Sequence, residues 1–166
     1  MACALVACAQ EWTAQALELA AGPGATTQGD GVIHPSVHGW MGTSVGLYSS
    51  VSLSGQKNSV FSQQLATARL GYSAPLPKSK TIFAQVGLGG VFQRTLIFEQ
   101  NESMSQLSKW SRAAGLALGV HWTLKPGKNV FMQLGWDALF IPPGESTIYL
   151  TFGHIQSVYS GLGWNF

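Results

Sequence analysis

The stretch VYSGLGWNF at residues 158–166, with which the sequence ends, decides the fold. Its alternate positions are largely apolar, from Val158 through Leu162 and Trp164 to Phe166. The positions between them carry tyrosine, glycine and asparagine. A period of two residues is typical of a β-strand that has one apolar and one more polar face. The ending therefore predicts a strand that closes on an aromatic residue.

The same alternation recurs in five segments upstream, so the sequence predicts six strands after about residue 36. These expected strands are residues 41–53, 66–72, 82–92, 110–124, 130–140 and 158–166. Compact turns that contain proline connect two pairs of them, at 74–80 and 125–128. Polar segments lie at 54–59, 99–108 and 141–147. Short turns at one end and longer loops at the other are typical of a transmembrane barrel.

The composition is poor in charge and gives no sign of a membrane-spanning helix. Charged residues make up 10% of the 166 residues, against about 25% in an ordinary soluble domain. No segment approaches the roughly 20 apolar residues that a helix needs to cross a bilayer. The net charge of +2 comes without a basic patch, so nucleic acid is not an expected partner. The length fits a single domain.

The last eight residues, Tyr159 to Phe166, resemble the C-terminal signature of bacterial outer-membrane β-barrel proteins. The chain as a whole is similar to the small eight-stranded types (OmpA, OmpX, OmpW and opacity proteins), and its Ser- and Gly-rich strands are similar to those of spirochaete members. The resemblance implies an all-β, antiparallel, up-and-down transmembrane β-barrel of eight strands in the outer membrane. It also implies that the barrel-assembly machinery reads the C-terminal strand.

Six strands are two fewer than the smallest such barrel needs, because these barrels have an even number of strands and at least eight. The missing pair must come from residues 10–35 or from sequence upstream. Glu11–Ala21 can be a strand or a helix, with the Gly- and Pro-rich residues 22–35 as a loop. We therefore expect an irregular N-terminal segment or first hairpin at 10–35 and barrel strands at 36–166.

Residues 1–9, MACALVACA, resemble the remnant of a signal peptide. Small residues at positions 7 and 9 suit cleavage after Ala9. The run from Leu5 to Cys8 also resembles a lipidation motif, so both kinds of processing remain open. Cys3 and Cys8 are the two cysteines of the chain, which excludes a disulfide framework in the barrel.

Aromatic residues near the ends of the apolar faces predict the two girdles with which barrels meet the membrane interfaces. They are Tyr72, Phe92, Trp110, Trp122, Phe140, Trp164 and Phe166.

The opposite, lumen-facing parity carries polar residues and glycine. Arg69 and Asp137 are inward charges of opposite sign, which predicts an interior ion pair or, alternatively, a selectivity element. Other polar lumen residues are Gln85, Gln133 and His121. Lumen glycines such as Gly163 leave room for inward rings such as Phe131, which favours a plugged interior. The same rings can alternatively line a pocket for a small hydrophobic solute.

The resulting hypothesis is an integral outer-membrane barrel with a structural, surface-interaction or weak-pore role. The alternatives are transport or binding of small hydrophobic solutes, and a soluble periplasmic β-sandwich or lipocalin-like carrier. The lipid bilayer is the main expected partner. We expect no enzyme, no cofactor and no metal site, because the sequence has no HExxH, GxSxG, P-loop or dinucleotide motif.

Overall fold

The structure is a computed structural model that describes residues 17–27, 32–43, 45–57, 61–97, 107–142 and 154–166. Residues 1–16 lie outside the described residues, and with them the expected signal-peptide remnant, the candidate lipidation motif and most of the segment from Glu11 to Ala21. No helix that is long and apolar enough to cross a membrane occurs among the described residues.

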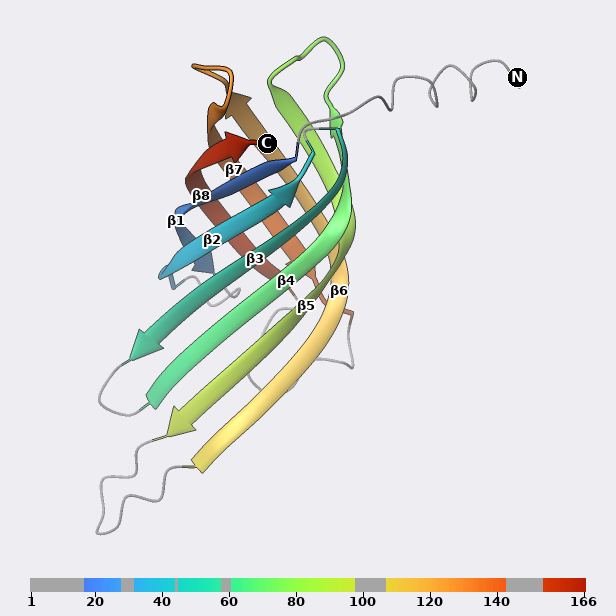
Figure 1. The fold of residues 1–166 in the computed structure, drawn as a ribbon. Helices are drawn as coiled ribbons and strands as arrows, with labels where there is room; N and C mark the ends of the chain where they lie inside the picture. Colours follow the sequence, from blue (N-terminus) through green and yellow to red (C-terminus); the bar gives the residue numbers. More distant parts are fainter. Residues whose placement is uncertain (1–16, 28–31, 44, 58–60, 98–106, 143–153) are drawn as a thin grey trace.

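Eight strands form one closed antiparallel barrel in which each strand pairs with its neighbours in the sequence (Figure 1). The strands are β1 (Glu18–Thr27), β2 (His34–Gly42), β3 (Gly46–Lys57), β4 (Phe61–Pro75), β5 (Ile82–Ile97), β6 (Leu107–Leu124), β7 (Val130–Phe140) and β8 (His154–Asn165). The predicted fold class, an up-and-down barrel of eight strands, is confirmed.

The barrel closes where β1 pairs with β8, from Glu18 opposite Asn165 to Thr27 opposite Gln156. The backbone N–H of Phe166 donates to the carbonyl of Leu17 over 2.9 Å, so the pairing continues to the last residue. The partner of the C-terminal strand thus comes from the N-terminal part of this chain.

The two ends of the barrel differ. The beginning of β1 and the end of β8 lie with the connections β2–β3, β4–β5 and β6–β7 at one end, which we call the turn end (Figure 1). The strand ends that flank the other four connections lie at the opposite end, the loop end. Strands β4, β5 and β6, of 15, 16 and 18 residues, are the longest and extend farthest toward the loop end.

The expected single strand at 41–53 is wrong, because the chain reverses between Gly42 and Gly46. Thr43 stabilises this turn: its side-chain hydroxyl donates to the Val45 carbonyl over 2.7 Å. Met41 faces Ser49 across the hairpin, so odd-numbered residues pair with odd-numbered residues. The alternation of faces therefore continues through the turn with unchanged parity, and periodicity alone hides it.

The expected loop at 22–35 also differs from the structure, because β1 runs on through Gly22-Pro23-Gly24 to Thr27. The register between β1 and β8 omits Gly22 and Pro23, as expected where proline removes a backbone donor. A Cβ atom at Gly22 would overlap the carbonyl oxygen of Ser160 on β8. Only glycine allows the two strands to approach so closely at this point.

The substitution Gly22→Val tests this closure. We expect the barrel to lose about 2–3 kcal/mol of stability, because the added side chain forces β1 away from β8. Urea unfolding in detergent micelles, followed by tryptophan fluorescence, measures the loss. The matched control is Gly127→Val in the turn after β6, where an added Cβ would meet no atom within 4 Å. Equal stability of both variants would contradict the close approach.

Candidate functional site in the barrel interior

Inward side chains fill the barrel in layers that follow one another from the turn end to the loop end. The first layer, at the turn end, contains an ion pair in which Lys125 Nζ lies 2.5 Å from Glu18 Oε1. Above it lie an aromatic layer, a polar layer around Arg69 and Asp137, and an apolar layer. On β7 this order runs from Phe131 through Asp137 to Leu139.

The aromatic layer contains rings from four strands, β2, β5, β6 and β8, that contact one another. Rings of His38 and Tyr159 stack at 3.6 Å between centroids, with 8° between their planes. Phe83 stacks on His121 at 5.0 Å, and Trp40 meets the same imidazole at 5.7 Å. The tilted contact of Trp40 with His121, and the stacking of Phe83 on His121 at 5.0 Å, are arrangements that stabilise aromatic pairs beyond the burial of their area. The rings close the cross-section of the barrel at this level.

A second cluster of the same layer contains Trp40, Tyr48, Phe131 and Ala20, all buried. Glycines opposite the rings provide the space: a Cβ at Gly163 would overlap the ring of Phe131. The interpretation that lumen glycine makes room for inward rings is confirmed for this pair.

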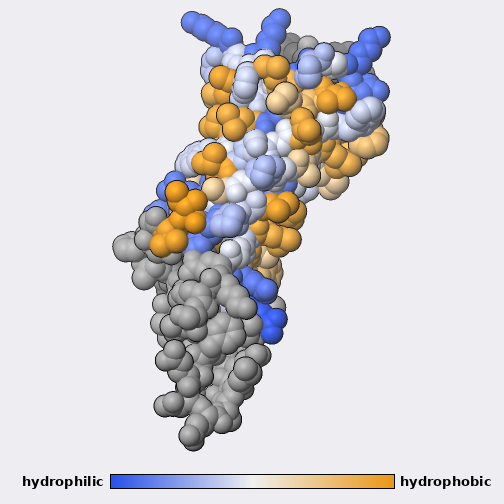
Figure 2. All heavy atoms as spheres, turned by 90° about the vertical axis from the view of Figure 1, so that its left-hand side faces the viewer, coloured by the Kyte–Doolittle hydropathy of each residue, from blue (hydrophilic) through white to orange (hydrophobic). Residues whose placement is uncertain are grey.

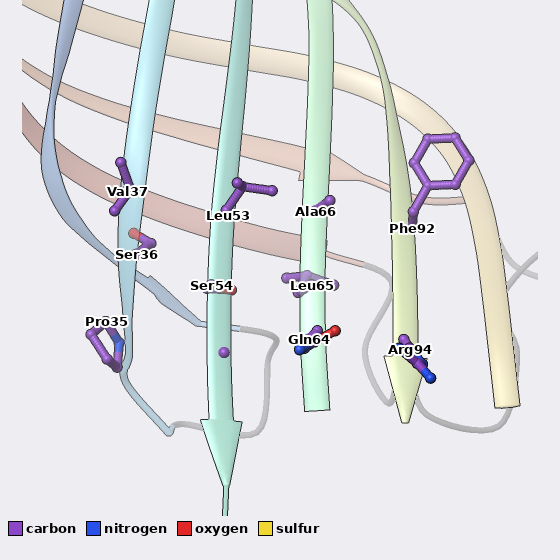
Figure 3. Close-up of a pocket in the computed structure, with 11 residues that line it drawn as sticks. Pro35, Ser36, Val37, Leu53, Ser54, Gln64, Leu65, Ala66, Phe92 and Arg94 are labelled. Carbon is purple, nitrogen blue, oxygen red and sulfur yellow. The ribbon is translucent and has the colours of Figure 1, made fainter. Parts of the chain in front are cut away.

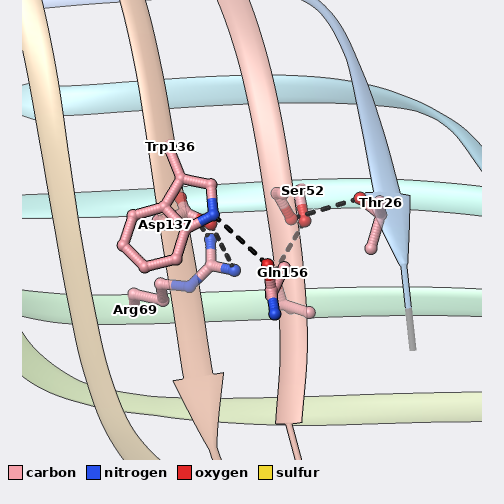
Figure 4. A network of polar contacts seen from close by, with 8 residues as sticks. Thr26, Ser52, Arg69, Trp136, Asp137 and Gln156 are labelled. Atoms are coloured by element: carbon pink, nitrogen blue, oxygen red, sulfur yellow. Dashed lines mark hydrogen bonds and ion pairs between the residues drawn. The ribbon is translucent and has the colours of Figure 1, made fainter. Parts of the chain in front are cut away.

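Arg69 of β4 and Asp137 of β7 meet across the interior in the polar layer (Figure 4). Arg69 Nη1 donates to Asp137 Oδ2 over 2.8 Å, and Nη2 lies 2.8 Å from Oδ1. The two side chains are 1% and 4% exposed, so each charge depends on the other for compensation. The structure therefore brings the two predicted lumen charges together.

Hydroxyl groups surround the ion pair. Ser52 and Thr67 share a hydrogen bond of 2.7 Å between their side chains, and Thr26 and Ser157 share one of 3.2 Å. These pairs join β3 to β4 and β1 to β8 on the inner side of the wall. These hydroxyl pairs thus connect neighbouring strands by side-chain hydrogen bonds inside the barrel.

The other predicted lumen residues, Gln85, Gln133 and His121, are buried and inward. The structure places His121 in the aromatic layer, not beside the ion pair. Within the described part of the chain, its two ring nitrogens have no hydrogen-bond partner, and its contacts are with Phe83 and Trp40.

An apolar layer near the loop end was missed by sequence reasoning. It joins one buried residue from each of five strands and one residue that follows β7, in chain order Leu65, Val91, Ala117, Leu139, Ile141 and Ile155. They continue the inward parity of the polar residues, two positions beyond Asp137 in the case of Leu139. The sequence signal for this layer is an apolar residue at a position where the alternation predicts an inward, otherwise polar, side chain.

The outer wall is apolar along most of its length. On β5, β6 and β7 the outward residues from Ile82 to Phe92, from Ala114 to Leu124 and from Val130 to Phe140 carry no charge. Eleven residues at roughly 3.3 Å each, tilted by about 40°, cover roughly 25 Å, the height of the apolar band of a membrane barrel. Figure 2 shows apolar residues spread over one side of the wall and hydrophilic residues at the turn end.

The predicted interface aromatics, apart from one, point outward and are exposed at the two ends of this band. Near the turn end lie Tyr72, Trp122, Trp164 and Phe166, and toward the loop end lie Phe92 and Phe140. Trp110 belongs to β6, but its side chain lies outside what the structure describes.

This distribution argues against the soluble carrier. A soluble barrel that carries hydrophobic molecules needs an apolar interior and a polar exterior. Here Leu88 and Leu162 on the outer wall are 71% and 66% exposed, whereas Arg69 and Asp137 are inside. Exposed apolar surface of such extent marks contact with a membrane or a partner. Among the described residues, no cluster of His, Cys, Asp and Glu can hold a metal ion.

Comparison with solved structures finds barrels of the same architecture. The major outer membrane protein of Thermus thermophilus matches with a TM-score of 0.58 and 10% identity over 91% of this chain and 100% of that one. Ail of Yersinia pestis matches with 0.54 and 9% identity, over 91% and 97%. The N-terminal barrel domain of Pseudomonas aeruginosa OprF matches with 0.53 and 16% identity, over 92% and 98%.

The fold is therefore that of the small outer-membrane β-barrels. No family model and no curated protein matches the sequence.

The ion pair can be tested by a double-mutant cycle. We expect Arg69→Met and Asp137→Leu each to cost about 3 kcal/mol, because either change leaves one buried charge without its counterion. The double variant should be closer to the parent than the sum of the two, since no charge remains. Urea unfolding in micelles gives the three free energies. Additive losses in the double variant would show that the two side chains do not interact.

Proposed function

We propose that the chain is an integral protein of the bacterial outer membrane with a sealed barrel, and that its role is structural or in surface interaction. The observation that carries this proposal is the layered interior, which the Arg69–Asp137 pair bridges from wall to wall. Narrow barrels are filled by side chains, and only much wider ones leave an open channel. A sealed barrel acts as an anchor, so its contacts with the surroundings lie at its ends and on its outer wall.

In the proposed orientation, the turn end faces the periplasm and the loop end faces outside. Short turns inside and longer loops outside are the general pattern of bacterial barrels. Exposed lysines at the turn end, Lys78 and Lys80 after β4 and Lys125 and Lys128 after β6, place charge in water next to the apolar band.

A purified and refolded chain tests both parts of the proposal. We expect an unboiled sample to migrate differently from a boiled one on a gel, because a closed barrel resists detergent. In a planar lipid bilayer, the inserted protein should give no steady conductance above the background. An unshifted band and a chain that stays in the aqueous phase would contradict membrane insertion. Stable conductance from an inserted barrel would contradict only the sealed interior and favour the weak-pore role.

A second candidate function, binding of a small hydrophobic solute, has one specific observation in its favour. The apolar layer formed by Leu65, Val91, Leu139 and Ile155 lies at the loop end of the interior, beyond the ion pair. It could take up an apolar molecule from outside. Passage through the barrel would still require the polar and aromatic layers to separate, so binding is favoured over transport.

We also propose that the last strand carries the signal for assembly. The ring of Phe166 is 70% exposed, so the folded barrel gains little from its contacts. We expect Phe166→Ser to leave urea stability in micelles within about 0.5 kcal/mol, and to reduce strongly the amount of folded barrel in outer membranes of expressing cells. Phe166→Tyr, which keeps an aromatic ring, is the control. Equal membrane yields for the parent and Phe166→Ser would contradict a signal at this residue.

A further inference from the structure

The turn end of the barrel contains a pocket of about 700 Å³, which is within the usual size range of small-molecule sites. It lies where β4, β5 and β6 meet the turn that joins β4 to β5. The groove over β2 to β5 that Figure 3 shows is different, because outward residues beside it, such as Leu53 and Phe92, face the bilayer. The rim of the turn-end pocket, with the exposed Lys80 and Thr81, lies beyond the apolar band, so this pocket opens to water.

The floor of the pocket is apolar and closed. Phe83 of β5 lines it, is 5% exposed and stacks on His121 of the aromatic layer. Pro75 of β4, the cross-strand partner of Phe83, lines it as well. The aromatic layer therefore separates the pocket from the rest of the interior. A ligand in this pocket would contact Phe83 and Pro75 and leave the seal of the barrel intact.

Hydroxyl groups that can donate hydrogen bonds form the polar part of the lining. Ser79 Oγ accepts the backbone N–H groups of Thr81 and Ile82 over 3.2 and 2.9 Å, so its own proton is available for a ligand. Thr123 is 3% exposed, and its hydroxyl has no hydrogen-bond partner among the described residues. A buried polar group without a partner is unfavourable, so a ligand that bonds to Thr123 Oγ1 gains affinity.

The positive charge of the pocket comes from Lys80. Among the residues that the structure describes, Lys80 pairs with no carboxylate. Lys125 also lines the pocket, but its ammonium is paired with Glu18. The backbone N–H of Thr123 donates to the Thr81 carbonyl over 2.8 Å, so the end of β6 lies beside the turn that carries Lys80. An ammonium group next to hydroxyl donors favours an anion, because charge-assisted hydrogen bonds are the strong ones.

We propose that this pocket binds a small organic carboxylate that carries an apolar group. The carboxylate accepts hydrogen bonds from Lys80, Ser79 and Thr123, and the apolar group lies on Phe83. In the proposed orientation the pocket opens to the periplasm, which is then the source of the ligand. The inference goes beyond the anchoring role, because it gives one end of a sealed barrel a ligand that does not cross the membrane.

Phenylacetate is a suitable probe, since it is soluble in water and small enough for the pocket. Phenylacetamide has nearly the same shape without the charge. NMR titration of the isotope-labelled full chain in neutral detergent micelles gives the affinity and shows which backbone amides respond. We expect saturable shifts at Lys80 and Thr123 with phenylacetate, and at least tenfold weaker binding of phenylacetamide.

Three variants locate the site. Lys80→Gln changes an exposed position and should weaken phenylacetate binding at least fivefold, with no effect on phenylacetamide. Thr123→Val keeps the shape of the side chain without its hydroxyl and should weaken phenylacetate binding at least threefold. Lys128→Gln removes the same charge from the turn after β6, outside the pocket, and should bind as the parent does. Gel mobility of unboiled samples verifies that each variant is folded.

The absence of saturable shifts in the folded parent would overturn the inference. Equal losses in Lys80→Gln and Lys128→Gln would also overturn it, because they indicate general attraction to a positive surface. Equal affinities for phenylacetate and phenylacetamide would contradict recognition of the carboxylate. None of these results concerns membrane insertion or conductance, which test the proposed function separately.

Discussion

The pairing of β1 with β8 is the constraint on which the rest of the structure depends. A sheet in lipid has no water to satisfy the backbone groups of an open edge, so it must close on itself. Here the closure runs from Glu18 opposite Asn165 to Thr27 opposite Gln156, with an interruption at Gly22 and Pro23. The interruption is tolerated because hydrogen bonds on both sides of it hold the register.

Closing only eight strands leaves a narrow interior, and this determines what the inward residues can be. Large rings fit only where the facing wall has glycine, as with Phe131 and Gly163, or Tyr159 and Gly135. A buried arginine fits only with a carboxylate in reach, as with Arg69 and Asp137. The inward positions of the strands therefore combine glycine, aromatic and polar residues because together they fill the narrow interior of the barrel.

Much of this architecture could be predicted from the sequence, because a barrel wall imposes a period of two over its whole length. From this alternation we expected Arg69, Asp137, Gln85 and Gln133 to face the interior. The structure places all four there. The alternation could not reveal the turn between Gly42 and Gly46, since a hairpin with odd residues opposite odd residues keeps the parity unchanged.

Local signals were misleading at the N-terminal strand. Gly22-Pro23-Gly24 has the composition of a loop, yet all three residues pair with β2, opposite His38, Val37 and Ser36, and Gly24 also pairs with Tyr159 of β8. The apolar layer was missed for a related reason. Leu65, Val91 and Leu139 share a parity with polar residues, and only the register of the closed barrel shows that they meet at one level. Long-range pairing, not local preference, determined both features.

The order of the layers favours an anchor over a channel. Water or an ion that entered from the loop end would have to pass the apolar layer of Leu139 and Ile155, which offers no polar group to replace its hydration. It would then meet an ion pair whose separation leaves two buried charges, and below it a layer of stacked rings. Each layer opposes passage by a different mechanism, so opening one leaves the others in place. The surfaces available for recognition are then the two ends of the barrel and its outer wall.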